Sequence, residues 1–159
     1  MKLGKWLKNW DLTKLKINLR FLEMEWQPQE ADREAAWELY IEMLTRIVTQ
    51  HLPDEHGDEK IALDSIHSLF PITREILRRK GRDCIQFSKI AIIVLNQLVR
   101  PFTTKWHRLS LEGAFSDPDN CLEFRRDLAE LQKDLRDYTH SLADIAEVED
   151  LTNLEKVDS

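Results

Sequence analysis

Four polar positions interrupt the most apolar part of this chain, and their spacing places them on one face of a helix. They are Asn96, Arg100, Thr103 or Thr104, and His107. Successive positions are three or four residues apart, which is the spacing of neighbours on a helix surface. A guanidinium group matches the oxygens of a phosphate, and an imidazole gains or loses a proton near neutral pH. Polar residues on such an apolar scaffold indicate a functional site or an internal polar network.

The pair Arg100 and His107, separated by six residues, resembles the Arg-x(4–6)-His signature of HEPN-type ribonucleases. That resemblance implies a small all-α bundle in which two subunits bring their Arg and His side chains together. It also implies cleavage of RNA without a metal ion. His107 would then transfer a proton, and Arg100 would hold the scissile phosphate. The resemblance covers residues 100–107 of the chain.

A structural interpretation of the same residues is also available, and we favour it. Arg100 would pair with a carboxylate of another helix, and His107 would donate to a backbone carbonyl near Pro101, because polar groups inside a fold are normally hydrogen-bonded. The candidate carboxylates are Glu23, Glu25 and Glu38. On this interpretation we assign no catalytic residue, and Arg100 and His107 are the candidates for one.

The stretch from Cys84 to Leu111 must position these side chains. Its middle, residues 90–95, is apolar on every side, and a helix of that kind has to be covered by other elements. Pro101 removes one backbone hydrogen bond and favours a kink. We therefore predict a buried, Pro-kinked helix at the centre of the fold.

The other helices follow from apolar periodicity. We predict them over residues 29–52, 59–79 and 121–145. The last one carries a heptad seam that is typical of packing beside an antiparallel neighbour, here the central helix. The seam residues are Cys121, Phe124, Leu128, Leu131, Leu135, Tyr138, Leu142 and Ile145. We predict an all-α, single-domain helical bundle of four to five main helices, with an N-terminal arm (1–26), the bundle (27–147) and an acidic, frayed tail (148–159).

A basic cluster lies around Gly81. Its members are Arg74, Arg78, Arg79, Lys80 and Arg82. Cations in the last turn suit the helix dipole, and glycine suits the position after a helix end. That structural explanation is the one we favour, and phosphate binding is the alternative.

The N-terminal residues form a short basic amphipathic pattern. Leu3, Trp6, Leu7 and Trp10 share one helical face, and Lys2, Lys5 and Lys8 lie between them. Such a segment docks on a partner or on a membrane surface, although we favour tryptophans that cover the edge of the core. Residues 12–26 fit either a helix or an extended arm that pairs with a second subunit.

Composition narrows the function classes. The chain has 159 residues and a net charge of −6, which is too acidic for general nucleic-acid binding. No apolar run is long enough to cross a membrane, we see no signal peptide, and the two cysteines fit a reducing compartment.

Residues 51–58 hold His51, His56 and Asp58 in a spacing that fits no metal site we recognise, so we expect no metal and no cofactor.

We therefore predict a non-enzymatic, cytoplasmic docking module that is oligomeric or part of a larger assembly, with a protein partner or a second copy of itself. The many large apolar residues and the charge-segregated ends of the chain motivate this prediction. The alternative is a HEPN-like metal-independent ribonuclease or toxin that uses Arg100 and His107. A third prediction is a peripheral membrane protein attached through residues 1–10.

Overall fold

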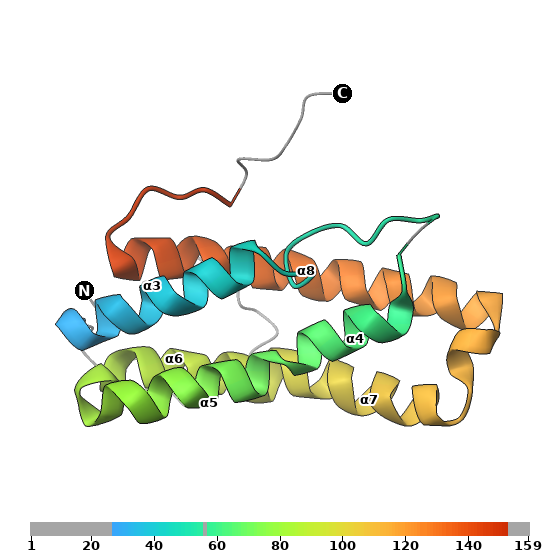
Figure 1. Ribbon diagram of the computed structural model, residues 1–159, viewed down its shortest axis with the longest axis horizontal. Helices are drawn as coiled ribbons and strands as arrows, with labels where there is room; N and C mark the ends of the chain where they lie inside the picture. Colours follow the sequence, from blue (N-terminus) through green and yellow to red (C-terminus); the bar gives the residue numbers. More distant parts are fainter. Residues whose placement is uncertain (1–26, 56, 153–159) are drawn as a thin grey trace.

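The computed structural model describes residues 27–55 and 57–152, which form helices and no strands (Figure 1). The α-helices are α3 (Glu30–Leu44), α4 (Glu59–His67), α5 (Leu69–Lys80), α6 (Ile85–Val94), α7 (Arg100–Leu111) and α8 (Pro118–Ala146). Short turns join some of them: η1 (Gly81–Cys84), η2 (Leu95–Val99) and η3 (Ala114–Ser116). The predicted all-α class is confirmed. The predicted count of four to five main helices is not matched, because residues 59–79 and 84–111 are each divided.

The described helices pack as an antiparallel bundle. α4 and α5 follow each other along one run, and α6, η2 and α7 form a second run behind it (Figure 1). α3 packs most extensively against α8, and it also contacts α5 and α6. The short η3 turn sends α8 back antiparallel to α7, as the sequence predicts. The largest fully buried side chains include Trp106, Tyr40, Phe87, Phe124 and Leu39.

The heptad seam of α8 is confirmed residue by residue. Phe124, Leu128, Leu131, Leu135, Tyr138, Leu142 and Ile145 are all buried, and Cys121 is half-buried. The helix begins at Pro118, where the Asp117 carboxylate accepts a hydrogen bond from the Asp119 N–H and the proline occupies the first turn. α8 packs most extensively against α3 and makes smaller contacts with its predicted neighbour, the central run, at η2 and α7.

The helix predicted over residues 29–52 ends at Leu44. The Thr49 hydroxyl donates to the Met43 carbonyl at 2.7 Å and so occupies an acceptor of the last turn. Side chains of Gln132 and Arg125 on α8 donate to carbonyls of the connecting segment between α3 and α4, namely those of Ile47, Gln50, Leu52, Pro53 and Gly57. These carbonyls have tertiary partners in place of helical ones, which apolar periodicity alone does not reveal.

The stretch 84–111 is not the fully buried centre that its sequence predicts. Ile92 is 49% exposed and Ile85 is 51% exposed. The other side of α6 meets α3, where the Phe87 N–H donates to the buried Asp32 carboxylate at 2.8 Å. Only one side of α6 meets described neighbours, so an apolar pattern on every side did not ensure burial on every side.

Pro101 is accommodated by a widened turn. It lies in the first turn of α7, directly after the π-helical turn η2. There the Arg100 N–H bonds to the Leu95 carbonyl, five residues back in place of the usual four. A proline ring collides with the carbonyl four residues before it in a regular α-helix, and the wider turn removes that conflict. The helical run therefore continues through the proline and presents Arg100 at the start of α7.

The α4–α5 run bends only slightly at Ser68. The Ser68 N–H donates to the carbonyls of Asp64 and Ile66, and Ser68 also precedes the first residue of α5. Pro71 lies in the first turn of α5, where a missing N–H costs little. Gly81 follows the last helical residue with φ 67°, which confirms the predicted glycine cap and its basic last turn.

The chain after α8 folds back onto α3. The Tyr40 hydroxyl lies 3.4 Å from the Glu149 carbonyl and 3.3 Å from a carboxylate oxygen of Asp150. Asp150 also pairs with His140 of α8. Residues 148–152 thus have tertiary contacts where the sequence predicts fraying, and residues 153–159 lie outside the described part. Within the described residues, no helix has the length and apolar character to cross a membrane.

Candidate functional site

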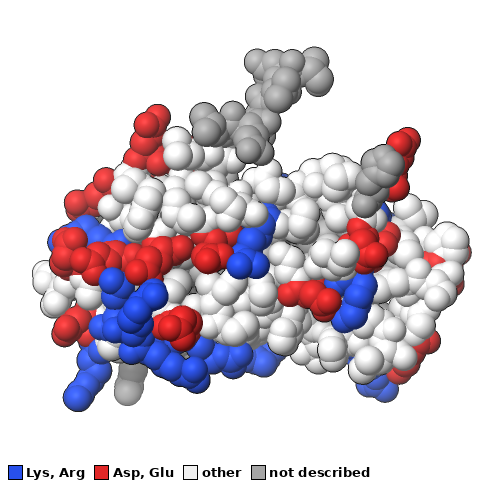
Figure 2. Space-filling view, in the orientation of Figure 1, with Lys and Arg blue, Asp and Glu red and all other residues white. Residues whose placement is uncertain are grey.

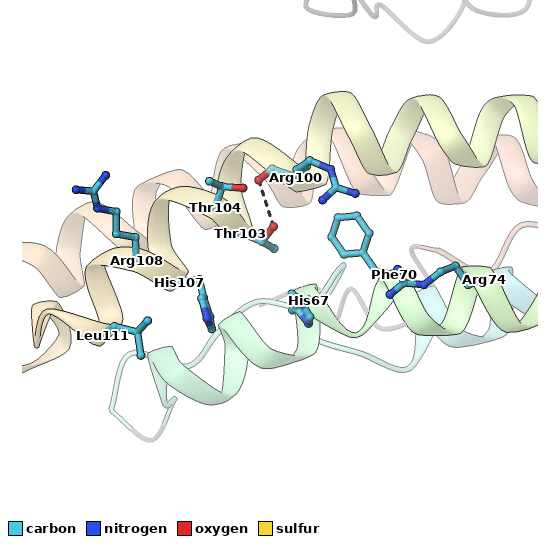
Figure 3. A pocket seen from close by; sticks show the side chains of 9 residues that line it. All are labelled: His67, Phe70, Arg74, Arg100, Thr103, Thr104, His107, Arg108 and Leu111. Atoms are coloured by element: carbon cyan, nitrogen blue, oxygen red, sulfur yellow. Dashed lines mark hydrogen bonds between the residues drawn. The ribbon is translucent and has the colours of Figure 1, made fainter.

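A groove of about 410 Å³ separates the α4–α5 run from α7 (Figure 3). Its lining residues are His67, Phe70, Arg74, Arg100, Thr103, Thr104, His107, Arg108 and Leu111. We call it the cationic groove, because it holds three arginines and two histidines and no carboxylate. Both sequence candidates, Arg100 and His107, line it and are exposed to solvent. The polar face recognised in the sequence therefore opens onto a surface groove.

Arg100 is held from below by an aromatic ring. Its guanidinium carbon lies 4.7 Å from the centroid of Phe70, and its Nε donates to the Asn96 side-chain oxygen at 3.1 Å. The predicted carboxylate partner is absent among the described residues, because Glu38 pairs with Arg79 and Lys80. Glu23 and Glu25 lie outside the described residues. Arg100 is thus oriented while most of its donors face the groove.

His107 points from α7 toward α4 (Figure 3). Its ring stacks on that of His67, with 6.4 Å between the centroids and 24° between the planes. The sequence predicts that His107 donates to a backbone carbonyl near Pro101, but its ring makes no hydrogen bond to any described residue. Both ring nitrogens of His107 are therefore available to a ligand.

The two threonines of the predicted polar face differ. Thr103 is buried, and its hydroxyl lies 3.3 Å from the Val99 carbonyl and 3.2 Å from the Arg100 carbonyl. Thr104 is exposed on the groove rim. The Thr103 hydroxyl therefore hydrogen-bonds to backbone carbonyls next to the widened turn, whereas Thr104 reaches solvent.

On the opposite wall of the groove, the sequence had singled out Arg74, as a member of the basic cluster around Gly81, but not His67 or Phe70. His67, Phe70 and Arg74 are spaced by three and four residues, and the nearly straight junction at Ser68 keeps them on one face. Their spacing was a readable signal, because a histidine and an arginine flank a phenylalanine at helical positions. What the sequence could not show is that this face lies opposite Arg100 and His107.

Two cations of the cationic groove, Arg74 and Arg100, lack a carboxylate partner among the described residues, unlike other cations nearby. Arg74 makes no ion pair with a described residue. Lys105, on another face of α7, lies 2.8 Å from Asp127 and 3.0 Å from Glu123, and these hydrogen bonds, with the one to Asp127 the stronger, raise its pKa. Arg108 pairs loosely with Glu112 at 3.4 Å and projects away from α4 (Figure 3). Arg74 and Arg100 are therefore the groove cations best placed for an anionic ligand.

A second groove, of about 560 Å³, lies between α3 and α5, and we call it the apolar groove. It is lined by Trp37, Glu38, Ile41, Glu42, Pro71, Ile72, Glu75, Ile76 and Arg79. Trp37 is 43% exposed and Ile41 is 40% exposed. Acidic and basic side chains meet along the boundary of α3 and α5 (Figure 2), where Glu38 pairs with Arg79, and Glu42 pairs with Arg46 at 2.7 Å. Its charges are largely matched within the protein.

The remaining predicted sites have no counterpart among the described residues. The docking candidates Lys2, Lys5, Trp6, Lys8 and Trp10 lie outside that part of the chain. Residues 27–55 and 57–152 contain no group of three metal-ligating side chains. Cys84 is buried, and burial is the main cause that raises the pKa of the Cys121 thiol. Neither cysteine is disulfide-bonded.

Comparison with known proteins adds no relative. No protein-family model, no curated protein and no solved structure matches this chain.

Proposed function

We propose that the cationic groove binds the phosphodiester backbone of RNA and that the protein is a metal-independent ribonuclease. One observation carries the proposal: Arg100 and His107 both reach solvent and line one groove that has no carboxylate of its own. These are the two residues that the resemblance to HEPN-type ribonucleases singles out. An internal ion pair at Arg100, the main support for a purely structural role, is absent among the described residues.

The proposed roles follow from the chemistry of each side chain. The guanidinium groups of Arg100 and Arg74 bind the non-bridging oxygens of a phosphate. The Phe70 ring under Arg100 fixes the direction of its guanidinium and limits the entropy lost on binding. His107 exchanges a proton with the ribose hydroxyl or with the leaving oxygen. RNA is the expected substrate because its 2′-hydroxyl supplies the nucleophile.

The test is cleavage of a labelled single-stranded RNA in the presence of EDTA. Wild-type protein is expected to produce fragments that end in a 2′,3′-cyclic phosphate. His107→Ala is expected to slow cleavage by about 10²- to 10⁴-fold. Arg79→Ala is the matched control, since Arg79 lies on α5 near Arg74 but pairs with Glu38. Equal RNA breakdown by wild type and His107→Ala would contradict the proposal, because it would identify a contaminating nuclease.

A second candidate function is the docking module that the sequence predicts, acting as a homodimer. The apolar groove favours it, because Trp37 and Ile41 are large apolar side chains left open to solvent. A two-fold contact places the same patch on both sides. The paired charges around this groove make such a contact free of strong like-charge repulsion. Light scattering should then give twice the monomer mass, and Ile41→Glu should restore the monomer mass.

A further inference from the structure

The cationic groove holds two imidazoles, and they come from different helices of one chain. His67 lies in the last turn of α4, and His107 lies near the middle of α7. The rings face each other in a nearly parallel arrangement with centroids 6.4 Å apart. That separation is too long for a direct hydrogen bond between them, and each ring is exposed. Neither ring donates to or accepts from a described residue.

We infer that His67 is the second proton-transfer residue of the ribonuclease, acting with His107 on one phosphate. The inference rests on the proposed function and adds a residue that the sequence did not indicate. Proton transfer requires heavy atoms within about 2.6–3.2 Å. The nitrogens bond in the planes of the two stacked rings, so a phosphate group at the solvent-exposed edge of the pair presents an oxygen to each. The geometry assigns both proton transfers to this one chain, without a residue from a second subunit.

The reaction balances with these two groups alone. One imidazole takes the proton of the ribose 2′-hydroxyl as that oxygen forms a bond to phosphorus. The bond from phosphorus to the 5′-oxygen breaks, and the second imidazole, in its protonated form, gives a proton to that oxygen. The products are a 2′,3′-cyclic phosphate and a 5′-hydroxyl, so no water, metal or other reactant is consumed.

The other groove residues cannot take the second role. The guanidinium groups of Arg74, Arg100 and Arg108 stay protonated. The hydroxyls of Thr103 and Thr104 are too weakly acidic to exchange protons near neutral pH. Among the lining residues, His67 and His107 are therefore the two with side chains suited to act as general acid and general base.

The experiment measures RNA cleavage between pH 5 and pH 9 for wild type, His67→Ala, His107→Ala and the double variant. Wild type should give a bell-shaped profile, and each single variant should lose one limb and about 10²- to 10⁴-fold in rate. The double variant should be little slower than the slower single variant, because the two groups act as a unit. His51→Ala is the matched control, being an exposed histidine outside the groove. Melting curves check that each variant is folded.

Binding of an uncleavable RNA separates catalysis from affinity. With a 2′-deoxy residue at the cleavage position, His67→Ala should bind within about threefold of wild type, because the arginines hold the phosphate. Cleavage by wild type together with an unchanged rate and both pH limbs in His67→Ala would overturn the role of His67 and leave the proposed function intact. No cleavage by wild type would overturn both.

Discussion

Two arginines of this fold have opposite surroundings. The Arg125 guanidinium donates to Glu59 at 3.0 Å and to the carbonyls of Leu52, Pro53 and Gly57 at 3.0–3.2 Å. Its side chain is 19% exposed. At Arg100, by contrast, the described hydrogen bonds of the side chain reduce to one, from Nε to Asn96. The first arginine is saturated by the protein, and the second is left with donors that face a groove.

The difference separates structural cations from candidate ligand-binding cations. Carbonyls of the connecting segment between α3 and α4 have lost their helical partners, and Arg125 satisfies them. The widened turn before Pro101 needs no such help, since Arg100 itself provides the N–H for the Leu95 carbonyl. Charge alone therefore says little about an arginine; what decides is whether the surrounding acceptors use all of its donors.

Removing the saturated arginine should give the largest effect on stability. Arg125→Ala removes the hydrogen bonds to the carbonyls of the connecting segment and to the Glu59 carboxylate, at a cost of about 2–3 kcal/mol. The melting temperature should fall by about 5–10 °C. RNA affinity, measured at a temperature at which the variant is still folded, should stay within twofold of wild type. Arg126→Ala, an exposed neighbour on α8, is the control and should change stability by less than about 0.5 kcal/mol. Comparable losses of stability in both variants would show that the hydrogen bonds of Arg125 do not hold the connecting segment in place.

Removing the unsaturated arginine should do the reverse. Arg100→Ala should weaken RNA binding about tenfold, through loss of a charge-assisted hydrogen bond, and change stability by less than about 0.5 kcal/mol. The slope of log affinity against log salt concentration should fall by about 0.7, the value for one phosphate contact on a single strand. Fluorescence anisotropy at several salt concentrations measures both. A large loss of stability with unchanged affinity would return Arg100 to a structural role.

Sequence patterns predicted which helices form in this fold better than they predicted where each helix begins and ends. The heptad seam of α8 is local information, and it placed Phe124 to Ile145 in the core correctly. The end of α3 at Leu44 depends on Arg125 and Gln132, which are far away in the sequence. Ile92 shows the same limit, because its exposure depends on which side of α6 meets another helix.

The candidate site was half predictable for a related reason. Arg100 and His107 lie on one helix, so their spacing alone placed them on one face. His67 and Arg74 belong to another run, and only tertiary packing brings them to the same groove. Helix periodicity says which residues share a face, and the opposing face requires the fold.

A carboxylate placed beside Arg100 should give it an internal ion-pair partner, as Arg125 has. Thr104 lies four residues after Arg100 on α7 and is exposed, so Thr104→Glu supplies an acceptor within the same helix. RNA affinity should fall about three- to tenfold, because the new charge pairs with Arg100 and repels phosphate. Stability should rise by about 0.2–0.5 kcal/mol. Thr104→Gln has nearly the same size without the charge, and an equal loss of affinity in that variant would point to steric hindrance.

Acid should weaken contacts in which a carboxylate is satisfied by partners within the protein. The smallest effect that we expect concerns one such carboxylate, Asp150. Burial acts to raise the pKa of Asp150, but hydrogen bonds from Thr152 and His140 outweigh it, so that pKa is lowered. A lowered pKa means that Asp150 stabilises the fold above the unfolded value of about 3.9, and that this contribution is lost as the pH falls through the folded pKa. Urea denaturation should show that the free energy of unfolding decreases between pH 7 and pH 3. The decrease should be smaller in Asp150→Asn than in wild type, by less than about 1 kcal/mol. Asp144→Asn, which removes an exposed carboxylate of α8, should keep the full pH dependence. If Asp150→Asn keeps it too, the contacts of residues 148–152 with His140 and Tyr40 contribute nothing measurable to folding.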